Sequence, residues 1–243
     1  MAGSKTKRKR IELSSLHKEL QSLADDTKRS ILQGFFKTGK GEYAEGDIFL
    51  GVTVPQQRAI AKKYASLQLA DIITLLQSPI HEHRLTALLI LIHQYETGTS
   101  TKQYTIVRSY LAYTQYVNNW DLVDLSAPKL LGAYLLDKPR DRLYRLAVSS
   151  LLWERRIAMV ACHTFIKNND FADTLRIAQL LLYDREDLMH KATGWMLREI
   201  GKRDRHVLER FLTLHHKAMP RTMLRYALEH FSKKERKKYM VGL

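Results

Sequence analysis

A tryptophan and an aspartate, Trp120 and Asp124, lie four residues apart in the segment NNWDLVDLSAP. Residues four apart on a helix share one face, so the indole and the carboxylate would meet the same bound group. An indole face attracts cations, and a carboxylate can stabilise a developing sugar oxocarbenium ion and orient water against it. The pair therefore suits a positively charged purine nucleotide. The alternative is structural, with Trp120 in the core and Asp124 as a hydrogen-bond partner.

A second tryptophan, Trp195, lies in the basic segment KATGWMLREIGKR. Trp195, Arg198 and Lys202 follow the spacing i, i+3, i+7 and so fall on one helix face, with Lys191 one turn earlier. An exposed tryptophan flanked by three cations is typical of a nucleic-acid surface, and the alternative is a tryptophan that packs in the core. Gly194, beside it, would let another helix or a backbone come close.

Other chemistries find little support in the sequence. His81 and His83 are close, but no HExxH motif and no cysteine cluster accompanies them, so we expect no metal ion and no cofactor. Cys162 lies in the apolar segment IAMVACHTFI, where a buried inert thiol is expected. The segment GFFKTGK resembles a phosphate-binding loop, but Gly41 replaces the required Ser or Thr, and the preceding stretch is helical.

The elements that would position these residues are helices. Leu85, Leu88, Leu89 and Ile92 follow the i, i+3, i+4, i+7 pattern of a buried helix face, and strand-like alternation is nearly absent. Short turn signals such as SP, DKP and NND separate the helical stretches. The sequence therefore predicts an all-α chain of roughly a dozen helices joined by short loops.

A weak internal repeat is superimposed on these helices. Five marker residues are spaced by 36, 36, 35 and 34 positions, enough for two helices and two turns in each unit. Helical hairpins repeated at about this period indicate an α-solenoid of the HEAT type. The markers are Arg84, Trp120, Arg156, Lys191 and Arg225.

The repeat predicts a basic stripe. Stacked second helices line the concave surface of a solenoid, so basic residues near the markers would face one groove, which could follow a duplex backbone. The alternative is a set of solvated helix faces without a partner. The residues of this stripe are Arg84, Arg155, Arg156, Lys191, Arg198, Lys202 and Arg225.

The overall composition supports a polyanionic partner. Among 243 residues, 40 Lys+Arg oppose 25 Asp+Glu, a formal net charge of +15, and such side chains neutralise phosphates. The single cysteine excludes an intrachain disulfide, and no apolar run approaches a membrane span, so we expect a cytoplasmic protein, nucleoid-associated if bacterial. We also expect a disordered basic tail over residues 1–10 and a single domain over residues 11–243.

At several of these segments the chain resembles the AlkD-like family of DNA alkylation repair enzymes. The resemblance covers most of the chain, from about Ile31 to Met240. Each segment alone would be weak, but together they are specific: FFKTGKGEYAEGDIFLGVTVPQQR, NNWDLVDLSAP, WERRIAM, KATGWMLREIGKR and MLRYALEHFSKKER.

The resemblance implies specific roles. Trp120 and Trp195 match the two family aromatics that contact deoxyribose, and Asp124 matches the acidic residue that stabilises the sugar cation and positions water. Arg156 and Arg198 match basic residues at the DNA face. Phe35, or its neighbour Phe36, stands where the family has an early aromatic residue that approaches DNA. The resemblance also implies a HEAT-like solenoid fold. Its implied activity is excision of N3-alkyladenine and N7-alkylguanine without metal or cofactor and without extrusion of the base into a deep pocket.

The sequence thus predicts an all-α, HEAT-like repeat solenoid, an α-α superhelix with a concave basic groove. It predicts a monomeric, monofunctional DNA glycosylase of base-excision repair that acts on double-stranded DNA with alkylated purines such as 3-methyladenine and 7-methylguanine. Two alternatives stay open. One is a catalytically inactive DNA- or RNA-binding scaffold, and the other is a protein adaptor whose groove takes an acidic peptide.

Overall fold

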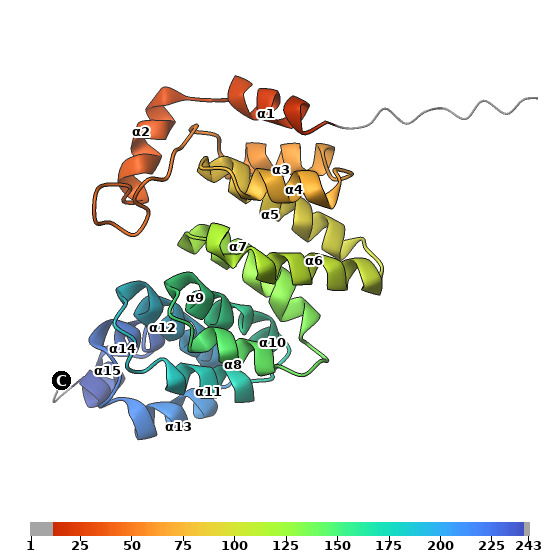
Figure 1. Ribbon diagram of the computed structural model, residues 1–243. Helices are drawn as coiled ribbons and strands as arrows, with labels where there is room; N and C mark the ends of the chain where they lie inside the picture. The colour runs from red at the N-terminus through yellow and green to blue at the C-terminus, as the bar shows by residue number, and fades with distance from the viewer. Residues whose placement is uncertain (1–11, 241–243) are drawn as a thin grey trace, which may run out of the picture. The chain divides into compact units, whose positions relative to one another are not determined.

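The computed structural model describes residues 12–240, and the predicted basic tail at residues 1–10 lies outside them. Helices make up most of the described chain, as predicted, and it contains no β-strand beyond one isolated bridge between Ile48 and Ile80 (Figure 1). Most of the connecting loops are short, but a long one over residues 36–53 follows the second helix. Its contacts divide the chain into two compact units, residues 1–109 and 110–243. The sequence predicted a single domain over residues 11–243. The boundary between the two units falls inside the helix Ser100–Ala112.

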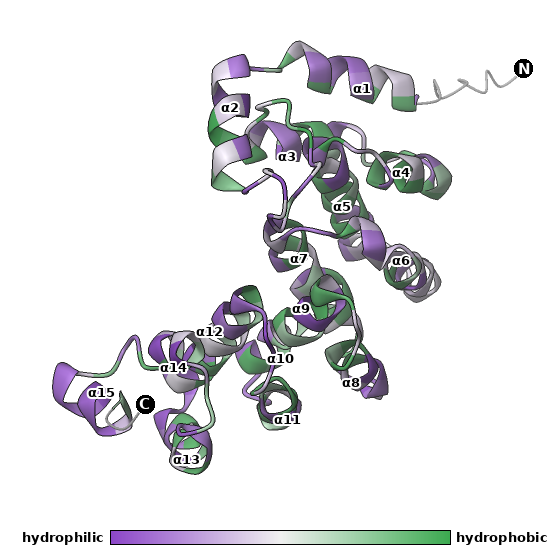
Figure 2. Ribbon diagram, turned by 60° about the vertical axis from the view of Figure 1, so that its left-hand side comes forward, coloured by the Kyte–Doolittle hydropathy of each residue, from purple (hydrophilic) through white to green (hydrophobic). Residues whose placement is uncertain are grey.

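Unit 1 is built around one long buried helix. That helix, α5, is buried over most of its length because its apolar residues occupy nearly every side, and α3 and α4 pack on it. The green colour of α5 in Figure 2 reflects this composition. The helices of unit 1 are α1 (Leu13–Ser22), α2 (Asp26–Phe35), α3 (Val54–Lys63), α4 (Leu69–Leu76), α5 (His81–Glu96) and most of α6 (Ser100–Ala112).

Unit 2 has two central helices, α9 and α12. Helix α9 packs against α7, α8 and α12, and α12 packs in turn against α13 and α14 (Figure 1). The elements of unit 2 are the 3-10 turn η1 (Thr114–Tyr116), α7 (Trp120–Ala127), the π-helical turn η2 (Pro128–Gly132), α8 (Asp141–Ala147), α9 (Leu152–Ala161), α10 (His163–Lys167), α11 (Ala172–Leu180), α12 (Asp187–Arg203), α13 (Arg205–His215), α14 (Arg221–Ala227) and α15 (Lys233–Met240).

Helices α12 and α14 approach each other at a glycine. A Cβ added to Gly194 would lie 2.5 Å from the carbonyl oxygen of Met223 and 2.6 Å from Cβ of Tyr226, closer than any side chain allows. The prediction that Gly194 admits a neighbouring backbone is confirmed. This contact fixes α12, the helix that carries Trp195, against its neighbour.

A hydrogen-bonded motif recurs at the starts of helices α5, α9 and α12. In unit 2, Ser149 Oγ accepts the Leu151 N–H at 3.1 Å, and Arg155 Nη1 donates to the Ser149 carbonyl at 3.0 Å. In unit 1, Ser78 accepts the Ile80 N–H on its side chain and the Arg84 guanidinium on its carbonyl, at 3.1 Å each. Near α12, the Asp184 side chain accepts the Glu186 N–H at 3.0 Å, and the His190 ring bonds the Asp184 carbonyl at 2.6 Å.

This motif sets the register of the repeat. It makes Arg84, Arg155 and His190 equivalent, at spacings of 71 and 35 residues. The sequence-based register, which used Arg156 and Lys191 as markers, was therefore one residue late in the second half of the chain. Identity between units is too low to reveal this offset, because Ser or Asp supplies the side-chain oxygen, Arg or His supplies the donor, and the other acceptor is a carbonyl oxygen that any residue provides.

Candidate active site

Helix α7 begins at the first of the two predicted aromatic residues. Asn119 is buried and precedes the helix, where its side-chain oxygen accepts the backbone N–H of Trp120 at 2.8 Å. Trp120 and Asp124 follow one turn apart, and both are partly exposed. Leu122 and Val123 are buried and turn α7 toward the core of unit 2. The i, i+4 spacing therefore presents the indole and the carboxylate on one face, as the sequence indicated.

Asp124 forms a two-pronged ion pair with Arg156 of α9. Arg156 Nε donates to one carboxylate oxygen at 2.9 Å, and its Nη2 donates to the other at 2.8 Å. The Asp124 side chain is 18% exposed and the Arg156 side chain 6% exposed. Because both oxygens accept hydrogen bonds, the geometry fits an ionised carboxylate, which retains lone pairs for further partners.

Arg156 also connects this carboxylate to α12. Its Nη1 donates to the Leu188 carbonyl at 2.6 Å. One guanidinium thus joins α7, α9 and α12. Leu188 and Trp195 are seven residues apart on α12, so they lie two turns from each other on the same side of that helix. The local fold therefore turns this side of α12 toward the Asp124–Arg156 pair.

Burial controls the electrostatics of Asp124. It raises the pKa of the carboxyl above its usual range, while Arg156 acts in the opposite direction and Asp121 adds to the rise. Behind α7, the Tyr110 hydroxyl donates to Ser126 Oγ at 3.0 Å, and Ser126 donates to the Leu122 carbonyl at 2.6 Å. Burial also raises the pKa of Tyr110, which remains a neutral hydrogen-bonding support.

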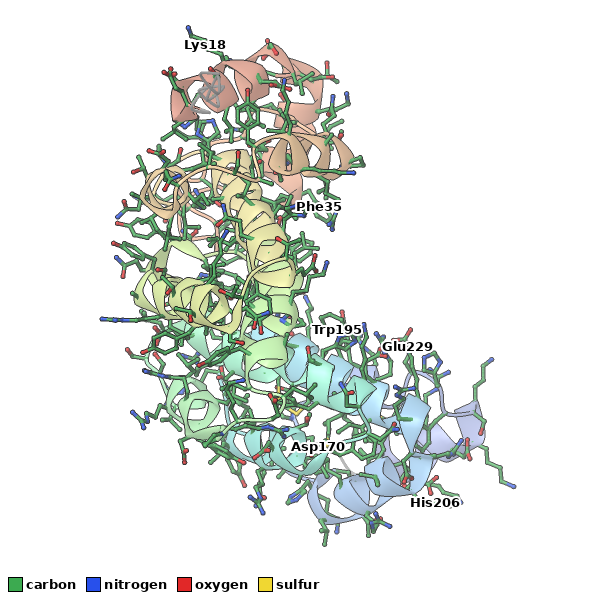
Figure 3. All side chains as sticks on the ribbon, turned by 90° about the vertical axis from the view of Figure 1, so that its right-hand side faces the viewer. Lys18, Phe35, Asp170, Trp195, His206 and Glu229 are labelled. Carbon is green, nitrogen blue, oxygen red and sulfur yellow. The ribbon has the colours of Figure 1, made fainter. Side chains whose placement is uncertain are left out.

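Trp195 is oriented by two neighbours. Its indole Nε1 donates to Glu199 one turn later at 3.1 Å, and the His163 ring lies 5.8 Å from it at an interplanar angle of 39°. Burial lowers the pKa of His163, which favours the neutral ring. Glu199 also accepts from Lys202 at 2.7 Å. Trp195 therefore has a defined setting and stays partly exposed (Figure 3).

Four predicted basic residues of unit 2 keep some accessible surface. Lys191 and Lys202 are 40% and 42% exposed, although each also pairs with a carboxylate of its own helix. Arg225 is exposed. Arg198 is 19% exposed and pairs with Glu229, which lies on the same side of unit 2 as Trp195 (Figure 3).

Three predicted DNA-binding arginines are instead held in structural ion pairs. Arg84 is 3% exposed and pairs with Asp47 at 2.7 Å. Arg155 is 16% exposed and pairs with Asp184 at 2.6 Å, and Arg156 is engaged as described. We therefore correct the expectation that these guanidiniums are open to phosphates. Arg84 and Arg155 also donate to carbonyl oxygens of the loops that precede their own helices, at Ser78 and Ser149.

Phe35 closes α2 in unit 1 and is 61% exposed, with its ring 5.1 Å from Phe36. Phe35 and Arg84 belong to unit 1, whereas Trp120, Asp124 and Trp195 all belong to unit 2. Unit 2 alone therefore carries the three predicted catalytic residues.

Glu199 and His163 were missed by the sequence analysis. Glu199 could have been found, because it lies four residues after Trp195 on a helix. His163 gave no signal, since only packing of α10 on α12 brings it to the indole. Among residues 12–240, no group of three or more metal-ligating side chains could hold an ion. Cys162 is buried, which raises its pKa to about 12.

The fold and this arrangement define an all-α helical repeat protein. The family model for the DNA alkylation repair enzyme matches residues 16–231. The chain therefore belongs to the DNA alkylation repair enzyme family, which supports a role in alkylation repair and contact with DNA.

Comparison of structures agrees on the fold. A solved structure described as a predicted DNA alkylation repair enzyme from Enterococcus faecalis matches with a TM-score of 0.67 at 15% identity, covering 86% of this chain and 97% of the other. No protein with a curated description matches the chain. No helix in the described part of the chain is long and apolar enough to cross a membrane.

Proposed function

We propose that the chain is a monofunctional DNA glycosylase that excises positively charged N3- and N7-alkylated purines, such as 3-methyladenine and 7-methylguanine. It would act as a monomer on double-stranded DNA in base-excision repair. One observation carries this proposal: the Asp124 carboxylate is held by two hydrogen bonds from Arg156 in a largely buried site, one turn from Trp120 on a partly exposed helix face.

The proposed reaction is dissociative. The bond between the anomeric carbon and the cationic base breaks, and its electron pair leaves with the base, which becomes neutral. The positive charge passes to the sugar, where the Asp124 carboxylate and the electron-rich faces of Trp120 and Trp195 stabilise it. Water then attacks the anomeric carbon and gives up its proton, to Asp124 or to solvent. The products are a free base and an abasic sugar.

Arg156 has a positioning role in this scheme. Its two hydrogen bonds fix the carboxylate and favour the charged form against the cost of burial. They occupy about two of the four lone-pair directions of the carboxylate, so the remaining directions are open to a sugar cation or a water molecule. Because Asp124 is largely buried, the low local dielectric strengthens its attraction to a sugar cation.

The direct test is base release from a duplex with a single 7-methylguanine, for wild type and Asp124→Asn. We expect release by wild type and a loss of about 100-fold or more in the variant, since removal of one such electrostatic stabiliser costs this much in other enzymes. Binding to undamaged duplex should be retained. Wild-type protein that binds DNA but releases no base would favour the inactive-scaffold alternative.

A matched control is Asp184→Asn. Asp184 forms the comparable buried pair with Arg155, but it has no tryptophan one turn away. If Asp184→Asn reduces base release as much as Asp124→Asn at equal folded fraction, the loss comes from the structural disturbance of breaking a buried Asp–Arg pair, and Asp124 has no chemical role.

The products provide a second check. The mechanism needs no amine nucleophile, so the strand should break only after alkali treatment of the abasic product. Lys191, a predicted basic residue of α12, is paired with Asp187 at 2.8 Å. Trapping of a protein–DNA adduct by borohydride would contradict the monofunctional scheme.

A further inference from the structure

Helix α15 has a charge that packing does not explain. Its eight residues read KKERKKYM, with five basic residues against one acidic residue, and it is among the most hydrophilic segments in Figure 2. It has no buried residue. Glu235, the single acid, is already paired with Arg205 of α13. The helix therefore carries an excess of four positive charges, counted within its own eight residues.

The two sides of α15 differ in character. Glu235 and Tyr239, one turn apart, form the docking side: Glu235 pairs with Arg205, and the Tyr239 ring lies 6.0 Å from Phe231 and 5.6 Å from His216. At about 100° per residue, the other side carries a row of lysines that spans roughly 140° of the helix. This lysine face consists of Lys233, Lys234, Lys237 and Lys238.

The lysine face works against the stability of the helix. All four lysines are exposed, and no carboxylate among residues 12–240 lies within ion-pair distance of them. The pairs Lys233–Lys237 and Lys234–Lys238 are like charges at i, i+4, each of which costs a few tenths of a kcal/mol. A face that is unfavourable for folding and unused by packing points to an external anion.

We propose that the lysine face of α15 is a second contact for the phosphate backbone of duplex DNA, outside the site around Asp124. The choice of duplex DNA rests on the proposed function. Helix α14 lies between α12, which carries Trp195, and α15 in both Figure 1 and Figure 2. A duplex that extends from Trp195 across α14 would therefore reach α15.

The chemistry of the face favours phosphate over other anionic partners. It has no apolar or aromatic side chain, so it lacks the hydrophobic half that a membrane-surface helix inserts. Lysine is a mobile point charge, well suited to sequence-independent phosphate contact. The helix would thus hold the protein on undamaged DNA while the site around Asp124 meets successive base pairs.

The test measures binding of the full chain to a labelled undamaged duplex across a range of salt concentrations. The variant replaces Lys233, Lys234, Lys237 and Lys238 by Gln. We expect affinity at low salt to fall about tenfold, and the slope of log affinity against log salt to become shallower by about 2 or more, since each lost phosphate contact removes about 0.9.

Two controls make the result specific. A charge-matched variant replaces Lys138, Arg142, Arg145 and Lys167, exposed residues around α8 and α10, by Gln; these helices lie away from α15 in Figures 1 and 2. Its salt slope should change little. A second variant replaces the four α15 lysines by Arg and should keep the wild-type affinity, because the charge is conserved.

Equal effects of the α15 and α8–α10 neutralisations would overturn the proposal, because net charge alone would then explain binding. Loss of affinity in the Lys→Arg variant would also overturn it. The proposal would also be overturned if a poly-glutamate peptide competed for the wild-type protein as effectively as unlabelled duplex of equal charge, because the face would then not prefer phosphate. These readouts need no base release, so a wild type that shows them without excising 7-methylguanine or 3-methyladenine would contradict the proposed glycosylase and leave this inference standing.

Discussion

Asp124 presents both oxygens to Arg156, at 2.9 and 2.8 Å, and of the two side chains the guanidinium is the more deeply buried. The cation therefore lies behind the carboxylate, which keeps the greater share of accessible surface. This order matters for function. A cationic substrate would meet the negative group first, while the positive group is screened by protein and fixed to the Leu188 carbonyl.

Removal of Arg156 should affect folding and chemistry together. Arg156→Ala leaves Asp124 largely buried without its cation, so we expect the free energy of unfolding to fall by about 3–5 kcal/mol. Arg156→Lys keeps the charge but loses the paired geometry and should be intermediate. Urea unfolding measures both. A loss below about 1 kcal/mol for Arg156→Ala would show that the pair contributes little to the fold.

The pH dependence of base release should follow Asp124. Burial raises the pKa of this carboxyl, and the reaction needs its charged form. The rate should therefore be low in acid and rise with pH through a midpoint above the ordinary value of 3.8. In Arg156→Gln the cation is gone, so the midpoint should move to still higher pH. Single-turnover rates on 7-methylguanine duplex measure this, and an unmoved midpoint would argue against Asp124 as the titrating group.

The setting of Trp195 should depend on His163. His163→Ala removes the ring beside the indole, and we expect base release to slow several-fold with little change in DNA affinity. His163→Phe retains a flat ring, and its rate should stay near that of wild type. Because burial already favours the neutral imidazole, its charge is not required. Equal loss in both variants would indicate that the imidazole itself, not its packing, matters.

Close packing of α12 on α14 should tolerate no added methyl group. Gly194→Ala places Cβ 2.5 Å from the Met223 carbonyl oxygen, and we expect a destabilisation of about 1–3 kcal/mol. Gly34→Ala is the matched control, since a Cβ there meets no atom within 4 Å, and alanine favours helix by up to about 1 kcal/mol. Thermal melts should move in opposite directions. A neutral Gly194→Ala would show that the two helices can separate at low cost.

The sequence predicted those features that depend on neighbours along the chain. The helices follow from apolar periodicity, and the shared face of Trp120 and Asp124 follows from i, i+4 spacing on α7. Gly194 was identified as a point of close approach, because only glycine lacks a Cβ. These features need no knowledge of which helix packs against which.

Features that depend on tertiary partners were beyond the sequence. Basic residues at the repeat period suggested open cations, but Arg84 and Arg155 meet Asp47 and Asp184 from loops 37 and 29 residues away. No local pattern distinguishes a guanidinium that will be buried from one that will face solvent. His163 could not be predicted for the same reason, since it reaches Trp195 only after α10 packs on α12.

The buried pairs have a consequence for how the chain reaches its fold. Similar helical hairpins in one chain can stack in the wrong order, a characteristic misassembly of repeat proteins. Asp47–Arg84, Asp124–Arg156 and Asp184–Arg155 each join segments of different hairpins, so a wrong order would bury charges without partners, at several kcal/mol each. The buried arginines should therefore favour the native order of the hairpins during folding.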